Sequence, residues 1–521
     1  MRLFALVSVA CAQHAQAVEA TLVFVTDAHG WYSGHGRHNE TFDADYGSLV
    51  SFVERLSARE QVFLLENGDL VDGGGLTDAT SARHPRRGES LFAVLDDVGF
   101  AARTLGNHEL YSPAAVRSLA LDAAPASAAF VSSNAIHAAT GEALARPFKR
   151  LALRGGGDDD DDGDAHLLVL GLLYEMTDAA PDFKVVSVAS VIATQWFADE
   201  VHAAAGVVAL AHMGATNPLL RKLLAAVRAM RGPDFPLVVV AGHTHVRAVV
   251  VLDACAVAVE AGRFSDTVGV VRMRGCAFER HLIDASRAQL GAFLAATPMA
   301  APAAATPMAA PAAATQQEPD TPKGLAVRAR IAAARAELGL DRVVGHASQT
   351  LRLAEPPGRP ASLWGWFLRS VAPPFILSAR FVRCGPGLLV TNAGTLRYDL
   401  LAGPVFVDDL FAVAPFSDEL RVLRCVPSAN VDAALHALAG QSSARKTLGG
   451  ASAFLWTAFD ADAQGAVDVV VDAYDAGRVF ALMRQSGAGE AFRPGLSFHT
   501  ALEAYFAAVP RASALRTSAI V

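Results

Sequence analysis

The sequence is poor in charged residues and has no long, uninterrupted apolar run beyond its first residues. Charged side chains make up 18% of the 521 residues, and 52 acidic residues outnumber 44 Lys and Arg, for a net charge of -8. This acidic balance argues against nucleic acid as a partner bound by bulk electrostatics. The most apolar later stretch, 236–259, is interrupted by Gly242, Arg247 and Asp253, so no stable membrane insertion is expected.

Cysteine is also scarce, and none of the five has the CxxC spacing typical of zinc sites. Cys11 falls within an expected signal peptide, which leaves Cys255, Cys276, Cys384 and Cys425. An even number in an exported chain permits two disulfides, and the sequence order suggests 255–276 and 384–425, one in each domain. Four cysteines nevertheless allow three pairings, and four buried free thiols are an equally good interpretation.

The first 17 residues are typical of a secretory signal peptide. Arg2 supplies a positive charge, Leu3–Ala12 is a short apolar run, and Ala15–Ala17 fits a small-residue cleavage site. A buried N-terminal helix is the alternative. Export predicts a secreted protein or one in the lumen of the secretory pathway, where the sequon Asn39–Thr41 could be glycosylated in a eukaryote.

The length predicts more than one domain, and the 52% hydrophobic composition is that of a globular protein. Two segments are typical of unfolded chain: the GGGDDDDDGD run at 155–164, a solvated loop, and the Ala/Pro repeat at 295–315, a semi-rigid linker. The predicted organisation is a signal peptide at 1–17, a first domain at 18–290, a linker at 291–322 and a second domain at 323–521.

The first half alternates apolar, β-rich runs with helical patterns, which predicts a layered α/β domain. The expected strands are Thr21–Thr26, Val62–Glu66, Ala102–Leu105, Leu167–Leu172, Val207–Ala211 and Leu237–Ala241. Helices are expected between them at Leu49–Ala58, Leu91–Val98 and Leu219–Met230. The second half mixes a helix with strands, at Val327–Leu338, Leu388–Thr391, Val422–Val426 and Val467–Ala473.

Polar residues follow five of these strands, at the ends where open α/β sheets bind ligands. The blocks are Asp27-Ala28-His29, Gly68 to Gly73 (GDLVDG), Gly106-Asn107-His108-Glu109, His212, and Gly242-His243-Thr244-His245. Residues i and i+2 of a strand share a face, so Asp27 and His29 are expected to point the same way, as are His243 and His245.

This collection of carboxylate, amide and imidazole groups suits a centre of two divalent metal ions. A single His or Asp is more often a satisfied polar residue, but five such blocks in order favour metal binding. The expected ligands are Asp27, His29 and His245 for one ion, Asn107, His212 and His243 for the other, and Asp69 as the bridge. Nitrogen and oxygen ligands favour zinc, manganese, iron or cobalt over calcium or magnesium.

The blocks DAH, GDLVDG, GNHE, AHMG and GHTH resemble those of the calcineurin-like metallophosphoesterase family, over roughly residues 20–290. The second half resembles the C-terminal domain of 5′-nucleotidases, in the N-x-G-x-x-R stretch Asn392–Arg397 and the P-F block Ala414–Phe416. The resemblance implies a β-sandwich flanked by helices and then a smaller α+β domain.

The same resemblance implies that Asn392 and Arg397 hold the substrate and that Phe416 stacks on a nucleobase. Core packing is the alternative for Phe416, and Tyr474 is a weak candidate for a second stacking aromatic residue. The motifs GNHELY, HGW, DYG and EAGR resemble a fungal-type branch of the family, whose members are vacuolar or secreted.

The implied reaction is hydrolysis of a small phosphoester, a nucleoside 5′-monophosphate, by attack of a metal-bridging hydroxide. His108 is expected to stabilise the transition state or protonate the leaving group. In typical 5′-nucleotidases an Asp three residues later pairs with this His, whereas Tyr111 stands here, so the partner is open and Glu109 is one candidate. A phosphodiesterase acting on 2′,3′-cyclic nucleotides and a non-catalytic, ligand-binding protein are the alternatives, and the oligomeric state is left open.

Overall fold

The computed structural model describes residues 18–38, 41–111, 126–154, 165–297, 320–378, 382–385, 387–416, 418–441, 454–457, 465–483, 491–492 and 496–508. The predicted signal peptide, the Asp-rich loop, most of the linker and two residues of the sequon lie outside these residues. The chain divides into two compact units, Met1–Asp72 with Ala79–Glu337 and Gly73–Asp78 with Leu338–Val521. Within the described part of the chain, every helix is too short or too polar to span a bilayer.

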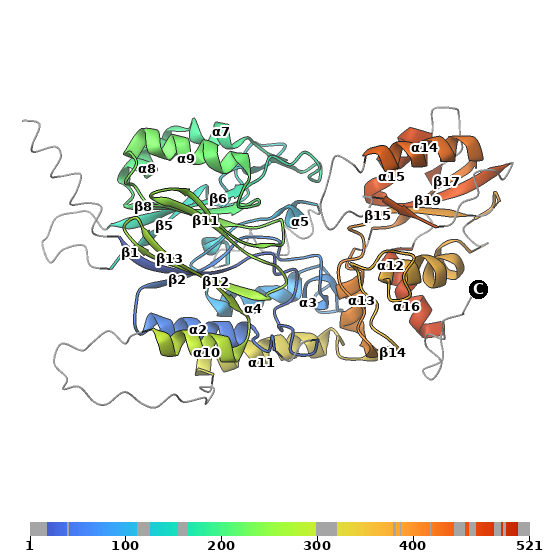
Figure 1. Ribbon diagram of the computed structural model, residues 1–521, viewed down its shortest axis with the longest axis horizontal. Helices are drawn as coiled ribbons and strands as arrows, with labels where there is room; N and C mark the ends of the chain where they lie inside the picture. Colours follow the sequence, from blue (N-terminus) through green and yellow to red (C-terminus); the bar gives the residue numbers. More distant parts are fainter. Residues whose placement is uncertain are drawn as a thin grey trace, which may run out of the picture. The chain divides into compact units, whose positions relative to one another are not determined.

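Two β-sheets form the centre of the first unit (Figure 1). One has the strand order β13-β12-β1-β2-β3 and the other β10-β11-β9-β8-β6-β5, while β4 and β7 pair separately. Apolar side chains from both sheets meet between them, including Phe24, Leu210 and Val240. The strands are β1 Glu19–Val25, β2 Val62–Glu66, β3 Ala102–Arg103, β4 Ala135–His137, β5 Phe148–Ala152, β6 His166–Leu173, β7 Phe183–Val185, β8 Gly206–His212, β9 Leu237–Ala241, β10 Arg247–Asp253, β11 Ala256–Ala261, β12 Thr267–Arg274 and β13 Ala277–Asp284.

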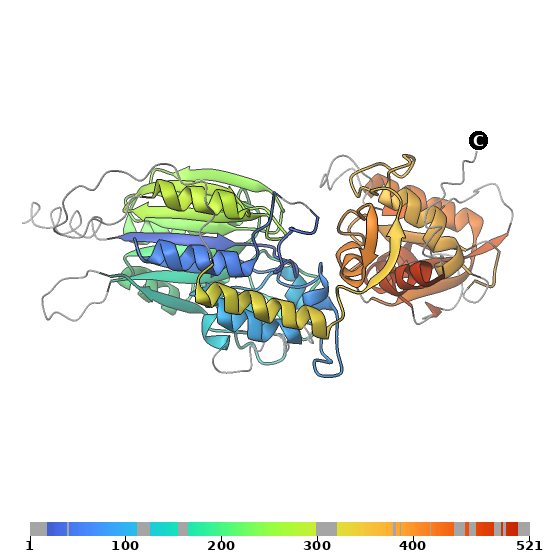
Figure 2. The same ribbon diagram turned by 90° about the horizontal axis from the view of Figure 1, so that it is seen from below.

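Helices cover the outer faces of both sheets, so the predicted β-sandwich flanked by helices is confirmed (Figures 1 and 2). Helices α7, α8 and α9 pack on the six-stranded sheet through residues such as Phe197 and Leu223. Helix α9 begins at an Asn217 cap followed by Pro218, a favoured start for a helix. The helices are α2 Tyr46–Ser57, η1 Glu89–Leu91, α4 Phe92–Val98, α5 Asn107–Leu110, η2 Ala126–Ala129, α7 Val188–Ile192, α8 Gln195–Ala203, α9 Pro218–Arg231, α10 Arg287–Ala296 and α11 Pro322–Glu337.

Helix α11 belongs to the first compact unit, although the predicted boundary assigned it to the second domain. It packs on α2, where Gly324 lies against Gly47 and the buried Val327 faces inward. Arg328 forms ion pairs with Asp45 and Asp320. The apolar face of α11 therefore covers the first unit, and composition alone does not reveal which unit an amphipathic helix covers.

The second unit contains a five-stranded sheet with the order β18-β15-β19-β17-β20 and a two-stranded sheet of β14 and β16. The helices and strands of this unit share an apolar core that includes Trp366, Phe367 and Phe498. Its elements are α3 Gly75–Asp78, β14 Val343–Ala347, α12 Leu363–Trp366, the π-helical η3 Phe367–Ile376, β15 Leu388–Asn392, β16 Gly403–Phe406, α13 Val407–Val413, β17 Leu420–Pro427, α14 Ser428–Gln441, β18 Phe454–Trp456, β19 Ala466–Asp472, α15 Ala473–Met483, β20 Ala491–Phe492 and α16 Phe498–Ala508.

Each unit carries one disulfide, in the pairing that the sequence order suggested. Cys255 in the β10–β11 turn is bonded to Cys276 in the β12–β13 turn. Cys384, which precedes β15, is bonded to Cys425 in β17. The interpretation as four free thiols is therefore wrong.

Candidate metal centre

All seven predicted ligands lie at strand ends of the first unit. Strands β1, β2 and β3 run parallel in one sheet, and β6, β8, β9 and β11 run parallel in the other. Their carboxyl ends therefore gather the polar blocks at one edge of each sheet. Asp27 and His29 follow β1, Asp69 follows β2, Asn107 begins α5, His212 ends β8, and His243 and His245 follow β9.

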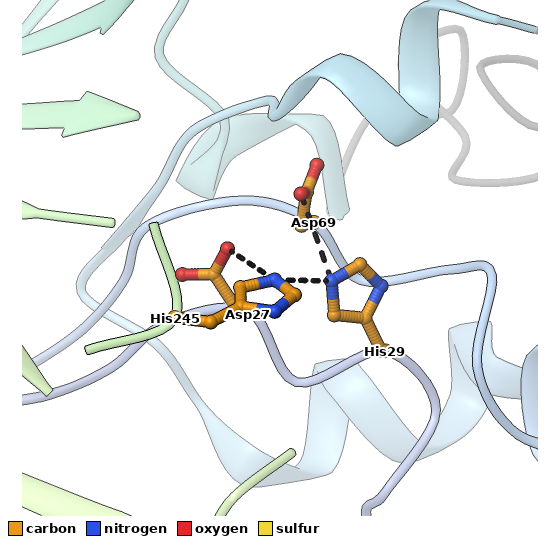
Figure 3. A group of neighbouring side chains, drawn as sticks. All are labelled: Asp27, His29, Asp69 and His245. Carbon is orange, nitrogen blue, oxygen red and sulfur yellow. Dashed lines mark hydrogen bonds and ion pairs between the residues drawn. The ribbon is translucent and has the colours of Figure 1, made fainter. Parts of the chain in front are cut away.

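One ligand group consists of Asp27, His29, Asp69 and His245, whose ligand atoms all lie within 4.8 Å of one another. Figure 3 shows these side chains pointing toward a common centre. Nε2 of His29 lies 3.2 Å from Nε2 of His245 and 3.6 Å from Oδ2 of Asp69. Nε2 of His245 lies 3.4 Å from Oδ1 of Asp27. Two imidazole nitrogens and two carboxylates thus converge as they would around a cation.

The second ligand group consists of Asp69, His212 and His243, again within 4.8 Å. Nε2 of His212 lies 3.1 Å from Oδ2 of Asp69. The amide oxygen of Asn107 lies 2.9 Å from Nδ1 of His243, which brings the predicted amide ligand to the same place. Asp69 belongs to both groups, as expected of a bridging carboxylate.

In His29 and His212, Nδ1 contacts a backbone carbonyl oxygen, and Nε2 therefore faces the cluster. Nδ1 of His29 is 2.7 Å from the carbonyl oxygen of Val71, and Nδ1 of His212 is 2.6 Å from that of Asn67. A proton on Nδ1 leaves the Nε2 lone pair facing the cluster. Nε2 of His212 is buried and lies 3.1 Å from Oδ2 of Asp69, so either a proton or a metal cation must lie between this nitrogen and the carboxylate. The residues present therefore fit two divalent ions.

The ligands converge through unusual backbone conformations rather than through strand alternation. Asp27 and His29 do point into one ligand group, but a shared strand face is not the reason, because both residues lie beyond the end of β1. Positive φ angles of 46° to 75° occur at Asp27, His29, Asp69, His243 and His245. Such angles are rare for residues other than glycine and cost about 1–3 kcal/mol each. Five strained ligands in one site are typical of a functional centre.

Two glycines allow the chain to pass close to the ligands. A Cβ at Gly106 would lie 2.1 Å from Oδ1 of Asp69, and one at Gly242 would lie 2.3 Å from Oγ1 of Thr26 and 2.8 Å from Oδ2 of Asp27. Side chains at these positions would displace the carboxylates. The glycines that precede the ligands in the sequence are therefore required by the packing of the site.

His108 lies beside the centre, and its partner is Asp72. The backbone N–H of His108 donates to Oδ1 of Asp69, at 3.0 Å. Its ring Nδ1 is 2.7 Å from Oδ2 of Asp72, whose other oxygen pairs with Arg87. The suggestion that Glu109 replaces the missing carboxylate is thus wrong. Asp72 stands in the same GDLVDG block as Asp69. This block could have suggested Asp72 as a partner, but its spacing in the sequence gave no link to His108.

Glu109 and Tyr111 have supporting roles. The buried carboxylate of Glu109 accepts backbone N–H groups of Asp69, Leu70 and Gly106, at 3.0, 2.8 and 2.7 Å. Burial raises the pKa of Glu109 to about 7. The hydroxyl of Tyr111 accepts a hydrogen bond from Nδ2 of Asn107, at 3.2 Å, and so turns the amide oxygen toward the ligand cluster. Tyr111 therefore orients a ligand instead of serving His108.

The carboxylates and imidazoles of the centre shift one another's pKa values. Burial opposes protonation of His212, but the carboxylates of Asp69 and Asp27 raise the pKa of His212 to about 10. Burial would raise the pKa of Asp69, yet the nearby His212 and His108 hold it well below its usual range. Burial, followed by the charge of His212, lowers the pKa of His243 to about 4. Metal binding would replace the proton on His212, as expected for imidazole ligands.

The substrate-binding residues expected in the second unit form two local pairs. The guanidinium carbon of Arg397 lies 5.8 Å from the ring centre of Phe416, and both side chains are partly exposed, which argues against core packing for Phe416. Asn392 ends β15, and its amide donates to Asp475 and accepts from the N–H of Gly394. Asp475, which the sequence did not single out, follows Tyr474 in the first turn of α15, and Tyr474 is 55% exposed.

Comparisons with known proteins agree with this architecture. Residues 353–463 match the family model described as the C-terminal domain of NAD nucleotidase. A protein named "Secreted protein" from Arthroderma benhamiae is 27% identical over 452 residues, which cover 78% of this chain and 66% of that protein. The chain thus spans just under two thirds of that relative's length.

Two solved structures with a similar fold match nearly the whole chain. The 5′-nucleotidase from Candida albicans has a TM-score of 0.76 at 20% identity, with 94% of this chain and 97% of that chain covered. The 5′-nucleotidase precursor from Thermus thermophilus has a TM-score of 0.64 at 16% identity, with 94% and 96% covered. The chain therefore shares its fold with these two 5′-nucleotidases, and residues 353–463 resemble the C-terminal domain of NAD nucleotidase.

Proposed function

We propose that this protein is a secreted, dinuclear-metal phosphoester hydrolase that dephosphorylates nucleoside 5′-monophosphates. The observation that carries the proposal is the convergence of the carboxylate, amide and imidazole ligands on Asp69, with His108 beside them. The fold, shared with the 5′-nucleotidases of Candida albicans and Thermus thermophilus, supports this class of reaction.

The chemistry divides between the metal ions and His108. Two bound divalent cations would lower the pKa of a water molecule and offset charge on the phosphoryl oxygens, and the ligand set suits zinc, manganese, iron or cobalt. Asp72 holds Nδ1 of His108, which leaves Nε2 facing the centre, 4.0 Å from Oδ2 of Asp69. From there His108 can donate a proton to the leaving oxygen or a hydrogen bond to a phosphoryl oxygen.

Recognition of the nucleotide is assigned to the second unit. A guanidinium group binds phosphate or carboxylate oxygens, and an aromatic face stacks on a base. Arg397 and Phe416 offer these two groups side by side. Asn392 is fixed by Asp475 at the end of β15 and offers an amide for hydrogen bonding. These contacts support a nucleotide as the substrate class.

Export is supported by two features. Each compact unit carries a disulfide, which is typical of proteins that fold in an oxidising compartment. The relative from Arthroderma benhamiae is named a secreted protein. We therefore place the protein outside the cell or in the lumen of the secretory pathway or vacuole.

A phosphate-release screen tests the proposal. The purified chain is loaded with zinc, manganese, iron or cobalt and assayed with nucleoside monophosphates, 2′,3′-cyclic nucleotides and simple aryl phosphates. The fastest release is expected from the monophosphates. Protein that binds two equivalents of metal but releases no phosphate from any of these compounds would refute the enzymatic function, and preference for the cyclic nucleotides would make it a phosphodiesterase.

A further inference from the structure

Glu260 lies at the carboxyl end of β11, beside the strand end that carries two of the ligands. Strand β11 pairs in parallel with β9, and Glu260 stands opposite Ala241, the last residue of β9. The ligand block Gly242–His245 follows Ala241 directly. Glu260 is fully buried, at 0% exposure. A buried carboxylate is stable only where hydrogen-bond donors replace water, so its donors indicate its role.

The carboxylate of Glu260 accepts hydrogen bonds from two ligand-bearing loops. Oε1 accepts both the N–H and the hydroxyl of Thr244, at 3.0 and 2.7 Å. Oε2 accepts the N–H of Ala215, at 3.3 Å. Thr244 stands between two of the ligand histidines, and Ala215 lies three residues after the ligand His212. One side chain therefore joins the loop that follows β8 to the loop that follows β9.

The two loops also contact each other directly. A Cβ at Gly214 would lie 2.6 Å from Cγ2 of Thr244, so the first loop passes too close to the second for a side chain there. The N–H of Gly242 donates to the carbonyl oxygen of Met213, at 3.1 Å. A displacement of one loop would therefore move the other, and Glu260 holds both.

The loop around Thr244 needs such an attachment because both neighbours of this residue have unfavourable backbone conformations. The φ angles of His243 and His245 are 75° and 62°, in the left-handed region that favours glycine. Such conformations persist only where the surrounding structure fixes them. The N–H of His243 donates to Asp27, at 3.0 Å, and the next N–H, that of Thr244, donates to Glu260. Two carboxylates thus hold successive N–H groups of this strained turn.

Glu109 provides a similar attachment at the other sheet. Its carboxylate joins the loops that follow β2 and β3, through the N–H groups of Asp69 and Gly106. Glu260 joins the loops that follow β8 and β9. Each sheet thus carries one buried glutamate that ties two ligand-bearing loops together. This similarity favours a role for Glu260 in placing ligands over a role in packing alone.

We propose that Glu260 is a positioning residue that couples the two metal sites. The residue it binds, Thr244, lies between His245, a member of the first ligand group, and His243, a member of the second. A change at Glu260 is therefore expected to disturb both groups together, although its carboxylate belongs to neither. This inference rests on the proposed function and extends it by one residue that acts through the ligands.

Cobalt binding tests this role without relying on turnover. The full chain is titrated with Co²⁺, and visible absorption reports on the ligand geometry at each site. Glu260→Ala is expected to weaken both cobalt sites by about 10–100-fold and to change the absorption bands. Glu260→Gln should restore most of the affinity, because its amide oxygen can still accept from Thr244. The control is Glu200→Ala, which removes a buried carboxylate paired with Arg150 in the same unit and should leave cobalt binding unchanged.

Thr244→Val gives a second test at an exposed position, which keeps the proposal testable if Glu260→Ala does not fold. It removes one hydrogen bond to Glu260 and should weaken both cobalt sites by about threefold. Unchanged cobalt affinity in these variants, a loss confined to one ion, or an equal loss in Glu200→Ala would each overturn the positioning role. Two bound cobalt ions without turnover of any phosphoester by the wild type would instead refute the proposed function, while the titrations would still test Glu260.

Discussion

The metal centre of the first unit and the substrate-binding residues expected in the second are built in different ways. Asp27, His29, Asp69 and His212 are at most 1% exposed, and their positions are fixed by strained backbone or by carbonyl contacts. In the second unit, Arg397 and Phe416 are partly exposed, as is Asn392. Under the proposed function, the reaction would depend on buried, fixed side chains, whereas recognition of the substrate would use partly exposed ones.

The largest expected effect comes from Asp69→Asn, which changes the buried candidate metal centre of the first unit. Asp69 is the member common to both ligand groups, so its replacement removes an anionic ligand from both ions. Activity should fall by several orders of magnitude, and elemental analysis should show loss of bound metal. Asp253→Asn is the control, because Asp253 pairs with Arg228 away from the ligands. Full metal loading in Asp69→Asn would contradict the bridging role.

The next effect concerns the pair of His108 and Asp72. His108→Ala should lower kcat by about 10²–10⁴-fold with both metals retained, as for removal of a general acid. Asp72→Asn should lower kcat less, because it only releases the orientation of the ring. Both losses should be greater for alkyl than for aryl phosphates, whose leaving groups need less protonation. The double variant should be no slower than His108→Ala, and fully additive losses would show that Asp72 acts independently of His108.

The contrast between Asp69 and Asp72 shows what the sequence can predict. The α/β layering and the gathering of the polar side chains were predictable, because each polar block follows a β-rich run and parallel strands bring their carboxyl ends together. The pairing of Asp72 with His108 was not, because it joins different strand ends through a left-handed backbone at Asp72, with a φ of 69°. The sequence also did not reveal that Glu109 is buried. Glu109 was a candidate partner for His108, but its carboxylate accepts hydrogen bonds from backbone N–H groups.

A smaller effect is expected from Phe416→Ala, among the partly exposed residues of the second unit. If its ring stacks on a base, kcat/KM for a nucleotide should fall by roughly tenfold, within the range for loss of one stacking contact. A simple aryl phosphate, which reaches the same metal centre without a nucleobase, serves as the matched substrate and should be hydrolysed nearly as fast as by the wild type. Equal losses on both compounds would argue against base stacking and for a general role of Phe416 in folding.

The smallest effect is expected from Tyr111→Phe, which distinguishes a residue that binds metal from one that only orients a ligand. Its hydroxyl accepts the hydrogen bond that orients the Asn107 amide, and loss of one such bond should weaken one of the two metal sites by about threefold. Stepwise removal of metal with a chelator, followed by elemental analysis, measures this change. Ser187→Ala, which alters a helix cap away from the ligands, is the control. If Tyr111→Phe lowers kcat at saturating metal as strongly as Asp72→Asn, then Tyr111 takes part in the reaction itself. Its role could then no longer be limited to orienting the Asn107 amide.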